Sequence, residues 1–398
     1  MTRAAEVGAA IPFHVPDLGA DERQAVLEVL ESGWLTTGPR VAELEAAMQE
    51  ALGIGHAVAV NSATAALHLA LEAMGIGPDD EVIVPTYTFA SSGEVVRYLG
   101  ARPRLADVDA RTLNVTAATI EPHLRPNTRA IQVVHIGGWT ADMAPILALA
   151  AERGIRVVED AAHAIPASRD GRHAATFGDA GALSFYATKT VTTGEGGMLV
   201  TDDAAIAERA RSMRLHGISR DAWKRYTAEG SWFYEIEDVG FKYNLTDLAA
   251  ALGIVQLRRA EETRLAREAV AGRYHAAFAD ADLLDLLDLP DWPTPGMVHA
   301  WHLYPIRLRL ERLAVDRAQV IEELKARGIG TSVHFIPLHL HPYYRRTYGY
   351  KPTDLPVATR EYEREISLPI YPSLEPAAVD RIVEALAGIL RSSRAAAS

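Results

Sequence analysis

The chain has 398 residues, of which 48% are hydrophobic and 23% charged, as in globular proteins that bury a sizeable core. The 40 Lys and Arg residues against 52 Asp and Glu residues give a net charge of −12, which argues against a nucleic-acid-binding or membrane-surface protein. Because the sequence contains no cysteine and no apolar run long enough to span a bilayer, it excludes thiolate chemistry and disulfides, and we expect a cytoplasmic protein.

Between residues 56 and 201, short β-rich segments alternate with helical patterns. The helical segments are Ala65–Met74, Ser91–Leu99, Met143–Arg153 and Ala204–Leu215. The strand segments are His56–Val60, Glu81–Pro85, Pro103–Val108, Ala130–His135, Arg156–Glu159, Ala182–Tyr186 and Met198–Thr201. Several of these strands are continuously apolar, as expected where helices cover both faces of a sheet. The alternation predicts an α/β domain with a mostly parallel sheet.

A second section follows a long helical pattern over Asp247–Phe278. The proline-rich segment Leu289–Pro295 predicts a boundary or bend. Beyond it we expect the strand Leu303–Leu308, the helix Arg317–Arg327, the strand Gly330–Phe335 and the helix Ala377–Arg391. We therefore predict an N-terminal arm and large domain over residues 1–255, and a smaller α+β domain over residues 256–398.

Residues that can carry chemistry follow several of the predicted strands, where ligands of open α/β sheets bind. Residues 61–64 (Asn-Ser-Ala-Thr) open a helix and suit a phosphate, or serve as a plain N-cap. The rings of residues 85–89 can stack on a cofactor or simply pack. Glu159 is followed by Asp160 and His163. Because successive strand residues point to opposite faces, Glu159 and Asp160 cannot share one task.

Lys189 lies just past a buried strand and before the glycine-rich residues 194–197. Burial lowers the pKa of a lysine and makes it a nucleophile or Schiff-base former, although a salt bridge to a strand-end acid is the plainer alternative. A phosphate cradle, an aromatic platform, Asp160 and Lys189 together match what pyridoxal 5′-phosphate needs. The lysine forms an imine with the cofactor, and the carboxylate keeps the pyridine nitrogen protonated. We see no set of residues with metal-ligand spacing.

The assembled motifs resemble the sugar aminotransferases of the DegT/DnrJ/EryC1/StrS family, of the aspartate-aminotransferase-like fold type I. The matching stretches span nearly the whole chain and are Glu31–Pro39, Asn61–Leu69, Pro85–Phe89, Glu159–Ala164, Ser184–Gly197, Gly240–Asp247 and Gly328–His339. The resemblance implies a large domain with a mostly parallel seven-stranded sheet sandwiched by helices, plus a smaller C-terminal α+β domain.

The resemblance also implies roles for individual residues. Lys189 becomes the Schiff-base lysine, Asp160 the partner of the pyridine nitrogen, and His163 the neighbour of the phenolic oxygen of the cofactor. The further cofactor-binding positions are Phe89, which stacks on the pyridine, Ala63, Thr64 and Ser184 at the phosphate, and Asn244. Asn244 matches a residue that reaches the phosphate of the neighbouring subunit, which implies a homodimer with shared active sites. The positions expected to line the sugar-nucleotide pocket are Trp34, Thr36, His135, Tyr243, His334 and His339.

The stretch Glu159–Ala164 resembles the branch of the family that aminates carbon 4 of a keto sugar. This implies transfer of an amino group from L-glutamate to a nucleotide-linked 4-keto-6-deoxy sugar, giving the 4-amino sugar and 2-oxoglutarate. We favour a dTDP-linked hexose over a UDP-linked one, and residues 136–139 (Ile-Gly-Gly-Trp) depart from the family pattern near the expected sugar. The alternatives are a 3-keto-sugar aminotransferase and a non-catalytic sugar-nucleotide-binding regulatory protein. Sugar dehydratases on the same fold carry His in place of Lys189, which argues against that activity.

Overall fold

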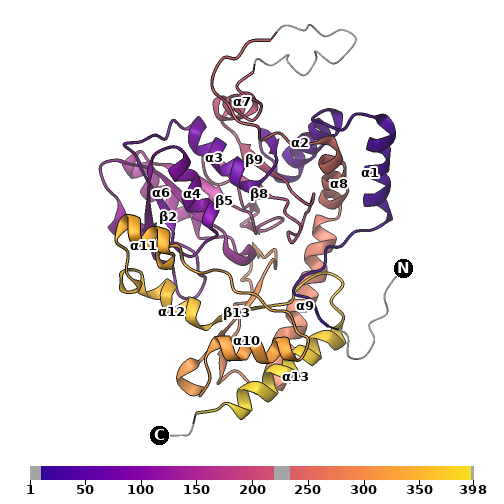
Figure 1. The fold of residues 1–398 in the computed structure, drawn as a ribbon, viewed down its shortest axis with the longest axis vertical. Helices are drawn as coiled ribbons and strands as arrows, with labels where there is room; N and C mark the ends of the chain where they lie inside the picture. Colours follow the sequence, from indigo (N-terminus) through magenta and orange to yellow (C-terminus); the bar gives the residue numbers. More distant parts are fainter. Residues whose placement is uncertain (1–9, 219–233, 396–398) are drawn as a thin grey trace.

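The computed structural model describes residues 10–218 and 234–395, which contain a seven-stranded sheet and two three-stranded sheets (Figure 1). The strands are β1 (His56–Val60), β2 (Glu81–Pro85), β3 (Arg102–Ala106), β4 (Thr128–Val134), β5 (Arg156–Asp160), β6 (Ser168–Arg169), β7 (Arg172–His173), β8 (Ala180–Ser184), β9 (Gly197–Thr201), β10 (Leu287–Asp288), β11 (Met297–Val298), β12 (Tyr304–Leu308) and β13 (Glu365–Leu368). The α-helices are α1 (Ala20–Ser32), α2 (Pro39–Leu52), α3 (Ala63–Ala73), α4 (Ala90–Tyr98), α5 (Ala117–Ile120), α6 (Met143–Arg153), α7 (Ala204–Met213), α8 (Asp247–Arg258), α9 (Ala260–Asp280), α10 (Arg317–Ala326), α11 (Pro342–Tyr348), α12 (Pro356–Arg364) and α13 (Pro376–Ser392).

The large sheet has seven strands in the order β1-β9-β8-β5-β4-β2-β3. Its central pairs, from β3 through β8, are parallel, whereas β9 runs antiparallel to both β1 and β8. Helices pack on both faces, and apolar side chains fill the space between them and the sheet. The predicted α/β architecture with a mostly parallel seven-stranded sheet is confirmed.

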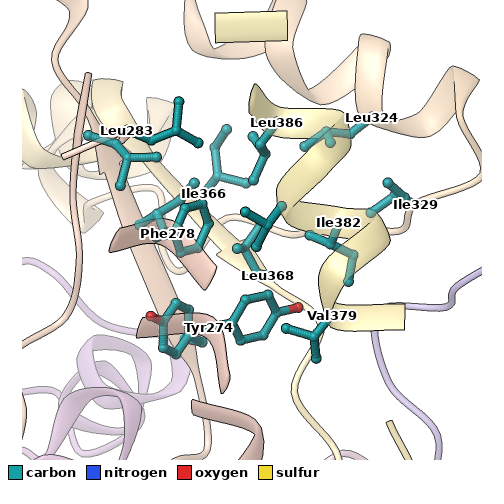
Figure 2. Close-up of a cluster of buried hydrophobic side chains, with 14 of the residues drawn as sticks. Tyr274, Phe278, Leu283, Leu324, Ile329, Ile366, Leu368, Val379, Ile382 and Leu386 are labelled. Carbon is teal, nitrogen blue, oxygen red and sulfur yellow. The ribbon is translucent and has the colours of Figure 1, made fainter. Parts of the chain in front are cut away.

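One of the three-stranded sheets, called the small sheet below, has the order β10-β12-β13 and packs against α9, α10 and α13. Figure 2 shows Ile366 and Leu368 of β13 among Tyr274 and Phe278 of α9 and the apolar face of α13. This core draws its buried residues from Ile11 and from positions 270–390. The predicted boundary between residues 255 and 256 falls inside α8, so the division into two domains stays a prediction.

Several element limits differ from the sequence prediction. The helical pattern over Asp247–Phe278 forms two helices, α8 and α9, because the backbone of Arg259 departs from helical geometry (φ −98°, ψ 5°). The predicted strand Gly330–Phe335 is wrong. Gly330 donates its N–H to the carbonyl of Ile11 (2.8 Å), whereas Ser332 pairs with Ser367, so the segment has different partners at its two ends and forms no ladder. Helix α6 has the predicted bounds.

Among residues 10–218 and 234–395, no helix combines the length and apolar character needed to cross a bilayer.

Candidate active site

The site forms where the parallel strands end. Strand β5 ends at Asp160, and the neighbouring strand β8 ends at Ser184, five residues before Lys189. As predicted, Glu159 and Asp160 point to opposite sides. Glu159 accepts the backbone N–H groups of residues 175 and 178 and pairs with a histidine inside the core, whereas Asp160 points toward α4. Only Asp160 is therefore available to the site.

Asp160 is a buried carboxylate with a fixed orientation. The hydroxyl of Ser92, on α4, donates to Oδ2 (2.7 Å), and the backbone N–H of Ala162 donates to Oδ1 (3.2 Å). Burial raises the pKa of Asp160, while these two hydrogen bonds and the nearby Lys189 ammonium lower it. Thr88 extends the network, since its hydroxyl lies 2.8 Å from that of Ser92. The carboxylate is thus oriented jointly by α4 and by the turn that follows β5.

Lys189 lies on the turn after β8, where its backbone N–H donates to the carbonyl of Tyr186 (2.9 Å). Its Nζ is 3.4 Å from Nε2 of His302. Burial lowers the pKa of the Lys189 ammonium to about 8, the carboxylate of Asp160 opposes this shift, and the guanidinium of Arg267 adds to it. An amine with such a pKa is partly neutral at physiological pH and can exchange a proton.

Aromatic rings surround this lysine. His163 accepts the backbone N–H of Gly137 at Nδ1 (3.2 Å), and its ring centroid lies 4.4 Å from that of His302. Phe335 stacks on His163 (5.7 Å between centroids) and contacts Phe89 (5.9 Å). Phe89 is nevertheless 60% exposed, so a large apolar ring lies open at the site. We name Lys189, Asp160, His163, His302 and His334 the Lys189 cluster.

The start of α3 lies at the position where a phosphate is expected from the sequence. Its first amides, at Ala63 and Thr64, have no acceptor within the helix. Ser62 caps the helix by accepting the N–H of residue 65 (3.1 Å). Gly197 of β9 pairs with Ser184 of β8 and lies so near the start of α3 that a Cβ would be 2.5 Å from the nitrogen of Ala63. The glycine therefore brings Ser184 beside the free amides.

Three residues expected at the cofactor phosphate or the sugar nucleotide lie around residues 34–37, and a fourth, Tyr243, lies against α3. Asn244 donates from Nδ2 to the hydroxyl of Thr37 (2.7 Å), and Trp34 donates from Nε1 to the carbonyl of Thr37 (3.2 Å). The carbonyl of Thr36 accepts the N–H of residue 247 (3.1 Å), and the hydroxyl of Tyr243 lies 3.1 Å from Nδ1 of His68. Among the described residues, none of these hydrogen bonds reaches the Lys189 cluster.

The three histidines expected in the sugar pocket have different environments. His135 and His339 are fully buried, and both ring nitrogens of each are engaged, by Glu159 and the N–H of residue 141 for His135 and by two threonine hydroxyls for His339. Neither ring offers a nitrogen to a ligand, so we do not propose these two residues as substrate contacts. His334 instead lies near Lys189, since burial and then the Lys189 ammonium lower its pKa to about 4.

Sequence reasoning missed several residues that shape the site. Ser92 and Phe335 contact the predicted residues directly, and His302 touches Lys189. Arg267 of α9 is buried and donates from Nη1 to the carbonyl of Ile370 (2.9 Å). Phe335 lies in one of the family-like stretches, Gly328–His339, and His302 directly precedes the predicted strand Leu303–Leu308, whereas Ser92 and Arg267 lie inside helical patterns.

Comparisons with known proteins agree with this geometry. The sequence model of the DegT/DnrJ/EryC1/StrS aminotransferase family matches residues 16–387. The spore coat polysaccharide biosynthesis protein SpsC of Bacillus subtilis is 46% identical over 388 residues, which are 96% of this chain and 98% of that protein. The aminotransferase TlmJ of Streptoalloteichus hindustanus is 35% identical and superposes with a TM-score of 0.88 over 96% of this chain and 100% of that chain. Spr1654 of Streptococcus pneumoniae, described as a sugar aminotransferase and solved in a PLP form, is 31% identical, with a TM-score of 0.89 over 96% and 99% of the two chains.

Proposed function

The chain belongs to the DegT/DnrJ/EryC1/StrS aminotransferase family, and we propose that it transfers an amino group from L-glutamate to carbon 4 of a nucleotide-linked 4-keto-6-deoxy sugar. The nucleotide we favour is dTDP, and the products are the 4-amino sugar and 2-oxoglutarate. One observation carries the proposal that the chemistry depends on pyridoxal phosphate. A buried carboxylate, Asp160, and a lysine with a lowered pKa, Lys189, lie within electrostatic reach of each other at adjacent strand ends.

The residues present fit pyridoxal phosphate. The free amides at Ala63 and Thr64, with Ser184 beside them, suit a phosphate at the start of a helix. The exposed ring of Phe89 suits a planar heterocycle, and the oriented carboxylate of Asp160 suits a protonated ring nitrogen. When bound, this cofactor supplies an electron-accepting ring that stabilises negative charge at the carbon that loses a proton.

The chain's own residues would then hold and move protons. Lys189 can take up a proton from the carbon of the amino donor, because its lowered pKa leaves part of the population neutral. Asp160 supplies a fixed negative charge whose direction Ser92 sets. His163 has a pKa well below its ordinary value because of burial and of Lys189, so it is neutral and donates from Nε2, since Nδ1 accepts from Gly137.

We also propose that two copies of the chain share their active sites. Asn244 lines an open cavity of about 400 Å³ together with Asn61, Thr193 and Glu195. Exposed leucines at positions 27 and 30 of α1, and at position 35 just after it, provide apolar surface on a helix that packs against α8. These features support a partner subunit seated here, with Asn244 and Tyr243 contributing to its site.

The experiment that tests this function has two steps. Purified protein is mixed with pyridoxal phosphate and L-glutamate, and we expect a visible absorbance band that glutamate shifts. Matched dTDP- and UDP-linked sugars, each with a 4-keto or a 3-keto group, are then compared as amino acceptors. The highest kcat/KM for the dTDP-linked 4-keto sugar is the expected result. Preference for a 3-keto sugar would overturn the position of amination, and a protein without the band would be a binder rather than an enzyme.

A further inference from the structure

A second set of polar residues lies on β13, outside the residues assigned so far. Side chains alternate along this strand, so that Ile366 and Leu368 enter the core of the small sheet, as Figure 2 shows. Glu365 and Ser367 point to the opposite face, and both are completely buried. A carboxyl group without solvent contact needs hydrogen-bond partners.

Those partners come from the segment around His334. Backbone hydrogen bonds between Ser332 and Ser367 (2.8 and 3.1 Å) hold this segment against β13. The backbone N–H of His334 donates to Oε2 of Glu365 (3.0 Å). The hydroxyl of Ser367 lies 2.5 Å from Oε1 of Glu365 and 2.9 Å from Nδ1 of His334. The three side chains form a continuous chain, from carboxyl to hydroxyl to imidazole.

The protons shared by Glu365, Ser367 and His334 can be arranged in two ways. When Glu365 is ionised, Ser367 donates to the carboxylate, so Ser367 must accept from Nδ1–H of His334, and Nε2 carries a lone pair. When Glu365 is protonated, its O–H donates to Ser367, Ser367 donates to Nδ1, and Nε2 carries the hydrogen. The state of the buried carboxyl group thus decides whether Nε2 of His334 accepts or donates.

The His334 end of this series of hydrogen bonds lies at the Lys189 cluster. The ring of His334 stacks on Phe13 (5.6 Å between centroids) and meets the edge of Phe335 (5.0 Å). Within the described ranges Nε2 of His334 has no hydrogen-bond partner and is not among the buried unpartnered atoms, so it stays open to solvent. Because burial and the nearby Lys189 keep His334 neutral, its tautomer is the property that changes.

The surroundings of Glu365 favour a carboxyl group that exchanges its proton near neutral pH. Burial raises its pKa to about 8, and the hydrogen bonds from Ser367 and the backbone of His334, with Arg317 and Arg307, oppose the rise. Arg307 lies opposite Glu365 on β12, but it donates to the carbonyl of Ala110 and lies 3.8 Å from Glu361. Tyr87 also faces this group, and its buried hydroxyl has no partner among the described residues.

We propose that Glu365, Ser367 and His334 form a proton relay that serves the Lys189 cluster, with Nε2 of His334 as its exit. This proposal rests on the proposed function for its substrate. A group of the bound sugar gives up a proton and an N–H bond forms at Nε2. The proton on Nδ1 passes to the oxygen of Ser367, whose own proton passes to Oε1 of Glu365. The carboxylate ends as a carboxylic acid, and reversal of these transfers returns the proton.

The direct test measures the tautomer of His334 without any assay of activity. Cofactor-free protein with ¹⁵N-labelled histidine and ¹³C-labelled glutamate carboxyl groups is titrated by NMR, with H334N and E365Q used to assign the signals. We expect the hydrogen on His334 to move from Nε2 to Nδ1 as pH rises, with the same midpoint as the carboxyl signal of Glu365. A His334 tautomer that does not change with pH, or a Glu365 signal already ionised near pH 5, overturns the relay.

Three variants separate the relay from a structural role. The amide of E365Q donates to Ser367 at every pH, so this variant should lock the hydrogen on Nε2. In S367A the Glu365 signal should still titrate, but the tautomer of His334 should no longer follow it. The matched control is T359V, which removes a hydroxyl from the similar but separate contact with His339 (2.9 Å) and should leave the His334 titration unchanged. A wild-type titration of His334 in E365Q would contradict the proposal.

Activity provides the second readout. Above pH 8, E365Q should lower kcat with the keto sugar by about 100-fold, the usual size of a general acid–base contribution, and should change KM little. If kcat in E365Q keeps the wild-type pH profile, the relay does not serve the reaction. If no substrate is turned over by any form, the proposed function fails while the NMR result still decides whether the relay exists.

Discussion

At the scale of single residues, burial acts on Lys189 and Asp160 in opposite directions. It lowers the pKa of the amine to about 8 and raises the pKa of the carboxyl group, so both shifts favour the neutral forms. Their mutual attraction and the hydrogen bond from Ser92 oppose this and preserve charge on Asp160. We therefore expect Ser92 to help keep negative charge on Asp160 for the proposed contact with the cofactor ring.

The substitution Ser92→Ala tests this role. Loss of a hydrogen bond to a charged group costs about 1.5–3 kcal/mol, so we expect kcat to fall roughly 10-fold or more. The pKa of Asp160 should rise further, because a stabilising donor is lost. Ser91→Ala, one position earlier in α4, is the control and should keep wild-type kcat. Equal kcat in the two variants would contradict the role given to Ser92.

Substitution of His339 should mainly lower stability, whereas substitution of His334 should mainly lower kcat. His339→Ala removes the ring contacts with the hydroxyls of Thr86 (2.7 Å) and Thr359 (2.9 Å) and leaves a cavity at a fully buried position, so the free energy of unfolding should fall by about 2 kcal/mol or more. Its kcat should stay within a few-fold of wild type. His334→Ala should cause a large loss of kcat and a smaller loss of stability than His339→Ala, because the ring of His334 is only partly buried. Urea unfolding and steady-state kinetics on both variants decide the matter.

At the scale of elements, the close approach of β9 to the start of α3 shapes the proposed phosphate-binding end of the site. The substitution Gly197→Ala would place a Cβ 2.4 Å from the carbonyl carbon of Ser62, so α3 must move. We expect at least about a 10-fold weaker Kd for pyridoxal phosphate, equal to about 1.4 kcal/mol. Gly388→Ala, whose Cβ meets nothing within 4 Å, is the control and should bind as wild type. An unchanged Kd for pyridoxal phosphate in Gly197→Ala would show that Gly197 does not shape the phosphate-binding end of the site.

Some helices and strands could be predicted from the sequence, and others could not. Helix α6 and the strands ending near Val60 and Asp160 have local signals, namely apolar runs that end in polar residues or glycine. Strand β13 was missed, because its alternation of polar and apolar residues spans only four positions and its pairing partner β12 lies far away in the sequence. Glu365 and Ser367 lie on that missed strand.

The sequence likewise predicted part of the site, where the signals are local, but not the contacts between residues that are far apart in the sequence. Lys189 and Asp160 were predicted from their places after strands, because the ends of parallel strands gather at one edge. The burial of His135 and His339 was not predicted, since it depends on Glu159, Thr86 and residues far along the chain. Sequence position indicates which edge a residue occupies, whereas tertiary packing decides whether its ring faces a ligand or the core.

At the scale of the whole molecule, Glu365 makes stability depend on pH. Its folded-state pKa of about 8 is above the ordinary value of 4.5, so the folded protein holds a proton that the unfolded chain releases in this range. The free energy of unfolding contributed by this group is therefore greatest below pH 4.5 and falls as pH rises to about 8.

The variant E365Q removes this dependence. We expect its free energy of unfolding, minus that of wild type, to increase between pH 5 and pH 8 and to level off above pH 8. Urea unfolding at several pH values provides the measurement. A difference that is constant across this range would mean that Glu365 is ionised at all of these pH values.

We expect Lys189 to form the covalent bond to pyridoxal phosphate. Mapping the modified lysine is feasible because the sequence has only five lysines, at positions 189, 224, 242, 325 and 351. The protein is loaded with the cofactor, reduced with borohydride, digested and mapped by mass spectrometry. We expect one phosphopyridoxyl group per chain, on Lys189, and no such group at that position in K189A. Stoichiometric labelling of another lysine, or none on Lys189 in fully loaded protein, would show that Lys189 does not bind the cofactor.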